Sequence, residues 1–514
     1  MSTDIRAISH QGSPAPGNRA GVREWAALAV LMLPVLLVSI DNTVLSFALP
    51  AISTALAPSA NQLLWIVDIY PLMLAGLLVA MGSLGDRIGR RRLLLVGAIG
   101  FGVVKVIAAY STSAEMLILS RALLGVFGAT LMPSTLSLLR NIFTDRRQRR
   151  LAIAVWASAF AGGAALGPIM GGWLLENNWW GSVFLITVPV IIALLPLVLW
   201  LVPESKDPAP GPVDVPSIVL SLAAMLPLVY AIKMFAEHGW SYGVFGAVTV
   251  GIVAAVAFVR RQLASATPML DVRLFANPVF SGAVASNLLS ILGFAGFLFF
   301  VAQFLQLVIG LSPMEAGTVL VPGLVASIIA GLVAVRLVRV IQPHLLIGGS
   351  FALSAAGYAI AAFVGEVPTV LSICAAFVAV GIGIGLAETL TNDIIIATAP
   401  AEKSGAAAAI SETAYEIGSV LGTAVLGSVL MATYRSDVQV PEAVSSGDSH
   451  VATETLGGAV DVAGGLGAAG DALLRSAHLA FDHGVQVTCS LGILIALGAA
   501  TVSALTLRNA DTEA

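Results

Sequence analysis

Four acidic side chains interrupt apolar runs of this 514-residue sequence, where a charge needs a specific reason. Asp41 and Asp68 each stand inside one long hydrophobic stretch, and Glu412 and Glu416 stand together in a later stretch. Burial disfavours the charged form of a carboxylate, so such a group can carry a proton near neutral pH. An arriving cation would expel that proton. The four acids are therefore candidates for proton coupling and cation binding, and the alternative is a structural carboxylate satisfied by a neighbouring hydroxyl, amide or arginine.

Helical spacing predicts the depth of these acids. Asp41 is about 15 residues, or roughly 22 Å, from the inner end of its run, which places it in the outer half of a membrane with Asp68 at similar depth. Glu412 and Glu416 are four residues apart, so they share one helix face near mid-membrane. Glu388 and Asp393 fall in the inner part of another run, where a helix-end or packing role is favoured.

Two cations also fall within apolar runs. Arg121 is followed by Gly125 and Gly128, which allow close helix approach beside it. We interpret it as a fixed charge that tunes a carboxylate and relays protons, with a structural ion pair as the alternative. Lys105 lies in the outer part of its run, and we expect its ammonium group to reach the outer interface rather than to contact a substrate.

Aromatic side chains near the acids could complete a site for a lipophilic cation, because the face of an aromatic ring attracts positive charge. Packing in the core or against lipid is the alternative for each. The candidates are Trp65, Tyr70, Trp156, Phe160 and Tyr415.

The composition is that of a membrane protein, since 58% of the residues are hydrophobic and 11% are charged. A span needs roughly 20 apolar residues. Fourteen segments meet this requirement, and they lie near 26–50, 62–84, 92–111, 115–139, 151–175, 181–202, 214–235, 241–260, 279–301, 314–336, 344–365, 367–391, 404–431 and 484–507.

Basic residues gather in alternate loops, which by the positive-inside rule places both termini in the cytoplasm. The loop pattern predicts two six-helix bundles separated by two additional spans. The divisions are a cytoplasmic tail at 1–25, a bundle at 26–202, the two extra spans with their linkers at 203–278, a bundle at 279–507 and a tail at 508–514. An extracellular loop at about 432–483 is expected to be mobile or partly helical.

The segment from Gly82 to Arg92 joins the second and third spans and concentrates charge at a membrane face. Its glycines, Gly82 and Gly89 among them, permit a tight turn. We expect its charged residues, Asp86, Arg87 and Arg90, to form an inner gate and a topology anchor. The segment 331–339 repeats the glycine and both arginines at the same offsets but lacks the acid, which indicates two related halves.

The fifth predicted span is dense in small residues, which allow close helix packing, and it contains a proline that bends it. We interpret this pattern as a hinge or seal between the halves. The residues concerned are Gly163, Gly167, Pro168, Gly171 and Gly172.

Other classes of function lack the residues they need. The sequence has no phosphate-binding loop of a primary pump and no nucleophile–base arrangement, so no enzymatic activity is expected. The two cysteines, Cys374 and Cys489, form neither a metal-ligand spacing nor a disulfide framework. We expect no metal, no cofactor other than a proton gradient, and no nucleic-acid partner.

Several of these motifs resemble one family. The loop from Gly82 is similar to the signature between spans two and three of the major facilitator superfamily. Arg121 with Gly125 resembles its fourth-span motif, and 163–172 resembles its antiporter motif. The stretch 41–50 is similar to the first-span motif of fourteen-span drug:proton antiporters. Trp65 to Tyr70 and Glu412 look closest to exporters of quaternary ammonium compounds.

The resemblance implies roles for particular residues. Asp41, Asp68 and Glu412 would be protonation or substrate-cation residues, with Arg121 as proton relay and Asp86 and Arg90 in the inner gate. The sequence departs from the family pattern in the tenth span, whose apolar body contains no acid, so a narrower range of divalent substrates is expected. Lys105 is a second departure, because a positive charge is unexpected there in a cation exporter.

The expected protein is thus a monomeric exporter in a bacterial-type cytoplasmic membrane, working by alternating access. It would exchange protons for lipophilic cations such as quaternary ammonium compounds, dyes and biocides. One alternative is a proton-coupled exporter of a neutral or anionic metabolite or another antibiotic. Another is a non-transporting membrane scaffold or sensor.

Overall fold

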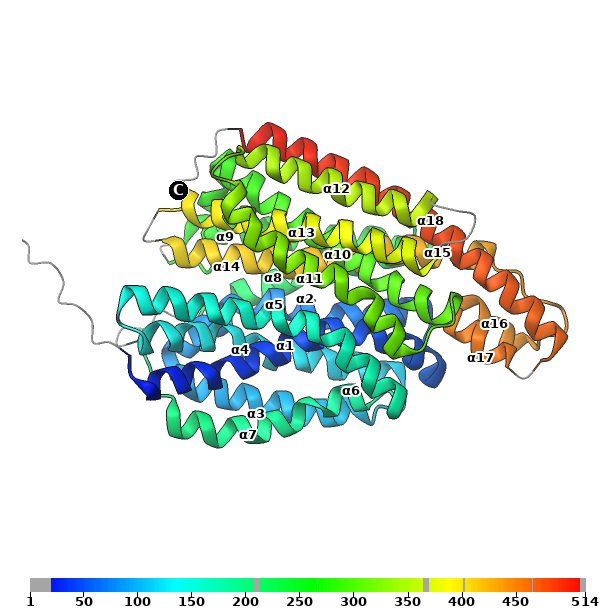
Figure 1. Ribbon diagram of the computed structural model, residues 1–514, viewed down its shortest axis with the longest axis horizontal. Helices are drawn as coiled ribbons and strands as arrows, with labels where there is room; N and C mark the ends of the chain where they lie inside the picture. Colours follow the sequence, from blue (N-terminus) through cyan, green and yellow to red (C-terminus); the bar gives the residue numbers. More distant parts are fainter. Residues whose placement is uncertain are drawn as a thin grey trace, which may run out of the picture.

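The computed structural model describes residues 20–207, 213–265, 267–363, 369–400, 403–464 and 466–508, and these form helices and short connections (Figure 1). Fourteen helical segments are long and apolar enough to cross a membrane. This confirms the predicted all-α membrane fold with its fourteen spans. The predicted tails at 1–25 and 508–514 lie largely outside the described residues, and the part of the first tail from Val22 onward is already helical.

The first six spans form the N-terminal half. Their helices are α1 (Val22–Leu56), α2 (Ala60–Ile88), α3 (Arg90–Ala109), α4 (Ala114–Ile142), α5 (Arg146–Asn177), and α6 (Ser182–Leu185) followed by α7 (Thr187–Leu201). Helix α1 packs along α5, while α4 packs along both α2 and α3. We call the end of the bundle where α2 turns into α3, with Arg87 and Arg90 to Arg92, the basic end.

The last six spans form the C-terminal half. Their helices are α10 (Pro278–Gln303) with the π-helical turn η2 (Phe304–Val308), α11 (Pro313–Leu337), α12 (Pro343–Phe363), α13 (Val370–Thr398), α14 (Ser404–Gly422) continued by the π-helical turn η4 (Thr423–Gly427) and α15 (Ser428–Asp437), and α18 (Ala468–Thr506). The halves meet mainly where α5 packs on α11 and α2 packs on α14.

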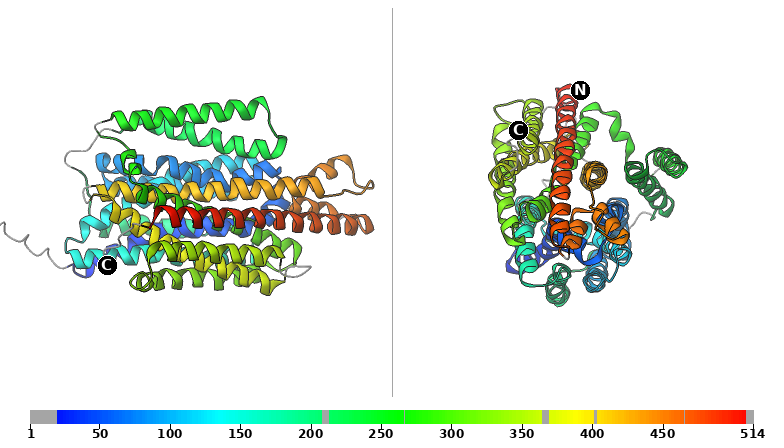
Figure 2. Two further views of the ribbon diagram at one scale, coloured as in Figure 1. Left: turned by 90° about the horizontal axis from the view of Figure 1, so that it is seen from above. Right: turned by 90° about the vertical axis from the view of Figure 1, so that its right-hand side faces the viewer.

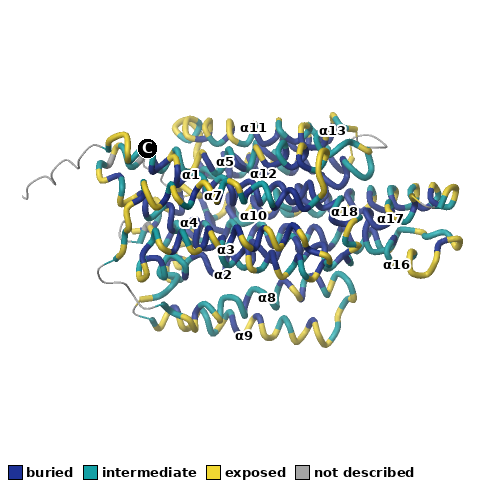
Figure 3. The backbone as a smooth tube through the Cα atoms, turned by 90° about the horizontal axis from the view of Figure 1, so that it is seen from below, coloured by how far each residue is buried: buried dark blue, intermediate teal, exposed yellow. Residues whose placement is uncertain are grey.

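Helices α8 (Val215–His238) and α9 (Tyr242–Ala264) are the two additional spans, and they pack chiefly on each other at one side of the bundle (Figure 2). Only 17% of the most apolar window of each is buried within the protein, against 72% for α1. The tube coloured by burial shows the same contrast, with the pair mostly teal and yellow (Figure 3). Lipid therefore covers most of their surface, and α8 touches the bundle along one face against α2, η4 and α15.

The segment at about 432–483, expected to be mobile or partly helical, is mostly helical. Helix α15 continues to Asp437, α18 begins at Ala468, and α16 (Ser446–Glu454) and α17 (Leu456–Ala463) form a hairpin that projects from the bundle (Figure 1). We call this the hairpin end. The Ser53 and Thr455 hydroxyls lie 2.9 Å apart, and Glu454 accepts a hydrogen bond of 2.8 Å from the Ala60 amide, so the hairpin is fastened to α1 and α2.

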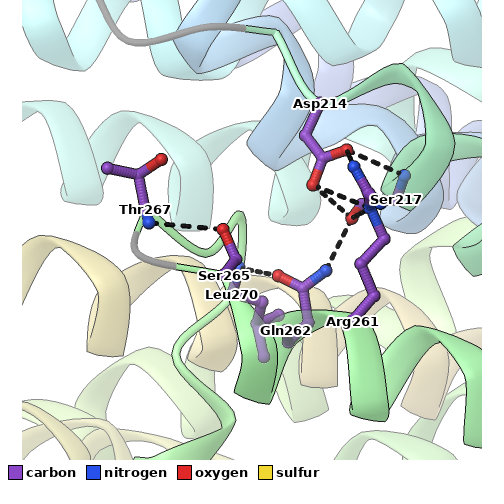
Figure 4. Close-up of polar contacts among 7 residues, drawn as sticks. All are labelled: Asp214, Ser217, Arg261, Gln262, Ser265, Thr267 and Leu270. Atoms are coloured by element: carbon purple, nitrogen blue, oxygen red, sulfur yellow. Dashed lines mark hydrogen bonds and ion pairs between the residues drawn. The ribbon is translucent and has the colours of Figure 1, made fainter.

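A polar network holds α8 and α9 together at the basic end (Figure 4). Asp214 caps α8 by accepting a hydrogen bond from the Ser217 amide and pairs with Arg261 of α9 at 2.8 Å. Gln262 donates to the Ser217 hydroxyl at 2.7 Å and accepts from the Leu270 amide at 3.1 Å, which connects the pair to the segment before the short helix η1 (Val272–Ala276). Hydrogen bonds from Arg261 and Ser217 hold the pKa of the Asp214 carboxyl below its ordinary value.

We expect Asp214→Asn to lower the free energy of unfolding by roughly 0.5–1 kcal/mol at neutral pH, because asparagine can still cap the helix but cannot pair with Arg261. A carboxyl whose pKa is lowered by folding stabilises the protein above its unfolded pKa, and this contribution disappears as pH falls through the folded value. The difference in Tm between wild-type protein and Asp214→Asn should therefore be constant near neutral pH and become smaller in strong acid. A difference in Tm that is the same at every pH would show that the Asp214–Arg261 ion pair does not stabilise the protein.

Candidate functional site

Asp41 is the centre of a buried cluster in the N-terminal half. Its carboxylate receives a hydrogen bond of 3.0 Å from Arg121 of α4 and forms an ion pair with the ammonium group of Lys105 of α3. All three side chains are at most 2% exposed. One negative and two positive groups leave the cluster with a formal charge of +1, so Asp41 already has its full complement of cations.

Lys105 does not reach the outer interface, and that prediction is wrong. Its ammonium group lies inside the half, 5.2 Å from the centroid of the Phe101 ring and 5.0 Å from that of Phe184. The aromatic faces and the Asp41 carboxylate together compensate for the lost hydration of the ammonium group, which explains why a lysine can remain fully buried there.

Arg121 binds α2 as well as Asp41, since its Nε donates to the Ile66 carbonyl at 3.0 Å. Its guanidinium also lies 4.6 Å from the Tyr70 ring centroid. These contacts place Arg121 between a carboxylate and an aromatic ring, close to the face of α2 that meets α14. Tyr70 thus contacts the protein's own cation, and its buried hydroxyl has no hydrogen-bond partner among the described residues.

Asp68 also has a cation beside it. Lys233 of α8 places its Nζ 2.8 Å from the Asp68 carboxylate, and both side chains are fully buried. The same Nζ lies 4.0 Å from the ring centroid of Trp65, one turn before Asp68 on α2. The two predicted acids of the N-terminal half are therefore both neutralised from within the protein.

The glutamates of the C-terminal half differ from Asp41 and Asp68, because they form no ion pair with any residue that the structure describes. Glu412 and Glu416 lie on one face of α14, and Glu388 of α13 is near enough for its charge to interact with that of Glu412. Glu416 is 3% exposed, and its Oε2 has no hydrogen-bond partner. Asp393, by contrast, is exposed.

An aromatic residue of the C-terminal half, Tyr415, lies near these glutamates and contacts the N-terminal half. Phe160 of α5 meets Tyr415 of α14 edge to face, with ring centroids 6.0 Å apart, so this pair crosses the interface between the halves. Trp156 lies one turn before Phe160 and donates from Nε1 to the Thr135 hydroxyl at 3.2 Å. Tyr415 therefore lies near the glutamates and contacts Phe160, whereas Trp65 and Tyr70 lie near Lys233 and Arg121.

The loop at the basic end is bound to itself and to the linker that follows α7. Asp86 pairs with Arg90 at 2.7 Å, and the Arg90 amide donates to the Ser205 carbonyl at 2.9 Å. Gly89 has a φ of +112°, a conformation that favours glycine and permits the direct passage from α2 to α3. The gating role of Gly82, Asp86, Arg87, Gly89 and Arg90 stays a prediction.

The small residues of α5 bring it against two partners. Gly163, Gly167 and Gly171 face α1, where an added Cβ would meet Ser39, Thr43 and Val44. Gly172 faces α11 of the other half, and a Cβ there would lie 2.7 Å from the Met314 Cα. Beside it, the Pro168 carbonyl contacts Gly317 of α11. The segment therefore joins the halves near the hairpin end, and its role as hinge or seal stays a prediction.

Sequence reasoning missed the partners of both aspartates. The available signal was the number of cations within apolar runs, since a buried lysine requires an acid as its counter-charge. Lys105 and Lys233 could thus have been matched to Asp41 and Asp68. Among the described residues, no group of three or more His, Cys, Asp or Glu side chains is placed to hold a metal ion.

Two six-helix halves with buried charges near their interface define the architecture of a secondary transporter. The sequence profile described as Major Facilitator Superfamily matches residues 31–423, and the chain belongs to this superfamily. The chain is similar over nearly its whole length to proteins that export drugs or confer resistance to them. It is 53% identical to the multidrug efflux pump LfrA of Mycolicibacterium smegmatis, covering 99% of this chain and 100% of that protein.

Further relatives agree with this membership, and a solved structure has the same fold. The chain is 36% identical to the methyl viologen resistance protein SmvA of Salmonella typhimurium, covering 93% of this chain and 97% of that protein. It is 32% identical to the tetracenomycin C resistance and export protein of Streptomyces glaucescens, covering 100% of this chain and 97% of that protein. The same fold occurs in a solved structure of a bacterial homologue of the human lysosomal transporter Spinster, in an inward-facing and unoccupied conformation. The TM-score is 0.67 at 18% identity, and the match covers 96% of this chain and 100% of that one.

We expect Asp41→Asn to lower the free energy of unfolding by about 3–5 kcal/mol, because it leaves two buried cations without a counter-charge. Lys105→Met should cost much less, since Asp41 would remain paired with Arg121. Thermal unfolding of the purified variants in detergent measures both. Equal losses in the two variants would show that Asp41 does not hold the cluster together.

Proposed function

We propose that this protein exports lipophilic organic cations, quaternary ammonium compounds among them, in exchange for protons by alternating access between its two halves. The observation that carries the proposal is the group of three glutamates, Glu388, Glu412 and Glu416, which have no cation partner among the described residues. Their neighbours Phe160 and Tyr415 provide aromatic surface at the interface of the halves. Carboxylate and aromatic groups together suit a cation whose charge is surrounded by apolar atoms.

The glutamates also provide a means of proton coupling. Like charges held close together disfavour joint ionisation, and burial of Glu416 adds to this effect, so protons would occupy part of the group in the absence of a cation. A bound organic cation would compensate those charges and release protons. Reversal of the exchange at the other face, where protons are plentiful, would discharge the substrate. In this scheme Asp41 and Arg121 act in the N-terminal half as a proton relay rather than as the main cation site.

The relatives support export of chemically diverse toxic compounds. One is a multidrug efflux pump and another confers resistance to methyl viologen, which is a quaternary dication. The tetracenomycin C exporter supports a second candidate, the export of a neutral or anionic antibiotic. Competition between cationic dyes and organic anions for the purified protein separates these two. A scaffold or sensor would show no substrate-dependent proton release.

Addition of tetraphenylphosphonium to the purified protein in weakly buffered detergent should release protons, as measured with a pH indicator. We expect Glu412→Gln and Glu416→Gln each to reduce the number of protons released by half or more, because each substitution removes one carboxyl group from the site. Asp393→Asn is the matched control, since that exposed acid on α13 lies outside the group. Wild-type protein that binds tetraphenylphosphonium without releasing protons would reject the coupling.

Asp68→Asn is expected to abolish efflux of an organic cation driven by a pH gradient in proteoliposomes while the protein still inserts. The physical reason is that an amide can neither take up a proton at this depth nor compensate a cation. Insertion and folding are checked by size-exclusion chromatography. Undiminished pH-driven efflux would remove Asp68 from the transport mechanism.

A further inference from the structure

The environment of the Lys233 ammonium group is that of a bound organic cation. A carboxylate, Asp68, lies 2.8 Å from Nζ, and the Trp65 ring centroid lies 4.0 Å from it. Apolar side chains from α2, α8, α14 and η4 enclose this region, namely Leu72, Val229, Val420 and Ala424. An acid, an aromatic face and an apolar wall are the elements that recognise a lipophilic cation. Here the protein's own lysine provides the positive charge.

The Lys233 ammonium group lies within hydrogen-bonding distance of the Asp68 carboxylate, at 2.8 Å, but the angles of the contact are poor. The Thr423 hydroxyl also acts on the carboxylate, whereas the ammonium group has no further hydrogen-bond partner among the described residues. A buried ion pair whose remaining protons and lone pairs are unsatisfied gains little over its desolvation cost. It is therefore a pair that another cation can break. Arg121, the other cation nearby, is committed to Asp41 and to the Ile66 carbonyl.

The position of Lys233 on α8 allows its ammonium group to move away. Lysine has a flexible four-carbon stem, and Glu237 lies one turn further toward the hairpin end on the same helix. Glu237 is 20% exposed, accepts a hydrogen bond of 3.0 Å from Asn61 and lies 3.6 Å from Arg435 of α15. A displaced ammonium group would thus approach a second carboxylate near the surface, which it would share with Arg435 of the C-terminal half and with His238.

We propose that Lys233 is a tethered competitor of the transported cation: its ammonium group occupies a cation site made by Asp68 and Trp65, and an organic cation displaces it toward Glu237. This inference rests on the proposed function and assigns a role in it to the first of the two additional helices. Through Lys233, α8 sets the affinity of the Asp68 site.

Tetraphenylphosphonium binding to purified variants in detergent, measured by calorimetry at mildly alkaline pH, tests this proposal. Lys233→Gln removes the competitor, so Kd should fall by roughly tenfold. Lys233→Arg replaces it with a guanidinium that grips a carboxylate with two parallel hydrogen bonds, so Kd should rise by several-fold. Asp214→Asn, at the other end of α8, is the control for a weakened helix and should leave Kd unchanged.

The opposite directions of the two substitutions separate competition from a structural role. If Lys233 is purely structural, Lys233→Gln should lower stability without lowering Kd, and Lys233→Arg should leave Kd unchanged. An unchanged Kd in either variant overturns the proposal. If Lys233→Gln does not fold, Lys233→Arg decides the question alone. Wild-type protein that fails to bind tetraphenylphosphonium would reject the proposed function and this inference together, whereas wild-type binding with unchanged affinity in folded Lys233→Gln rejects only the inference.

Discussion

Compensation of charge inside the bilayer is the constraint on which the rest of this structure depends. Removing an ion from water costs several kcal/mol even after relaxation, and a partner must offset most of that cost. In the N-terminal half the cost is met within the protein, because Asp41 has Lys105 and Arg121, and Asp68 has Lys233. In the C-terminal half the glutamates of α13 and α14 have no such partners among the described residues. The two halves are thus electrically unequal although they repeat the same six-helix plan.

The interface between the halves is therefore asymmetric in charge. Groups of net positive charge lie in one half and ionisable acids without counter-ions in the other, with Phe160 and Tyr415 in contact between them. The close packing of α5 on α11 at Gly172 and Gly317 keeps the halves in register at the hairpin end.

The two additional helices are peripheral by burial but not by chemistry. Most of α8 and α9 faces lipid, yet the end of α8 near the hairpin touches α2, η4 and α15, and it supplies a buried ammonium group to Asp68. The helix thereby contacts elements of both halves. The hairpin of α16 and α17 does the same from the aqueous side, since it is covalently part of the C-terminal half and hydrogen-bonded to α1 and α2.

The sequence alone specifies the fourteen spans, the repeat of the charged loop, the glycine-rich face of α5 and the acids within apolar runs, although it favoured a packing role for Glu388. Each of these follows from local rules: the thickness of hydrocarbon, the cost of an arginine within it and the spacing of small residues on a helix. The partners of the acids are a different matter, because they depend on how each helix is rotated and which neighbour it packs against. In the chain, Lys105 is 64 residues (105 − 41) from Asp41, and Lys233 is 165 residues (233 − 68) from Asp68. No local sequence pattern predicts a contact over such a separation. Only the packed bundle decides that two acids pair with cations of the protein and that three glutamates have no such partner among the described residues.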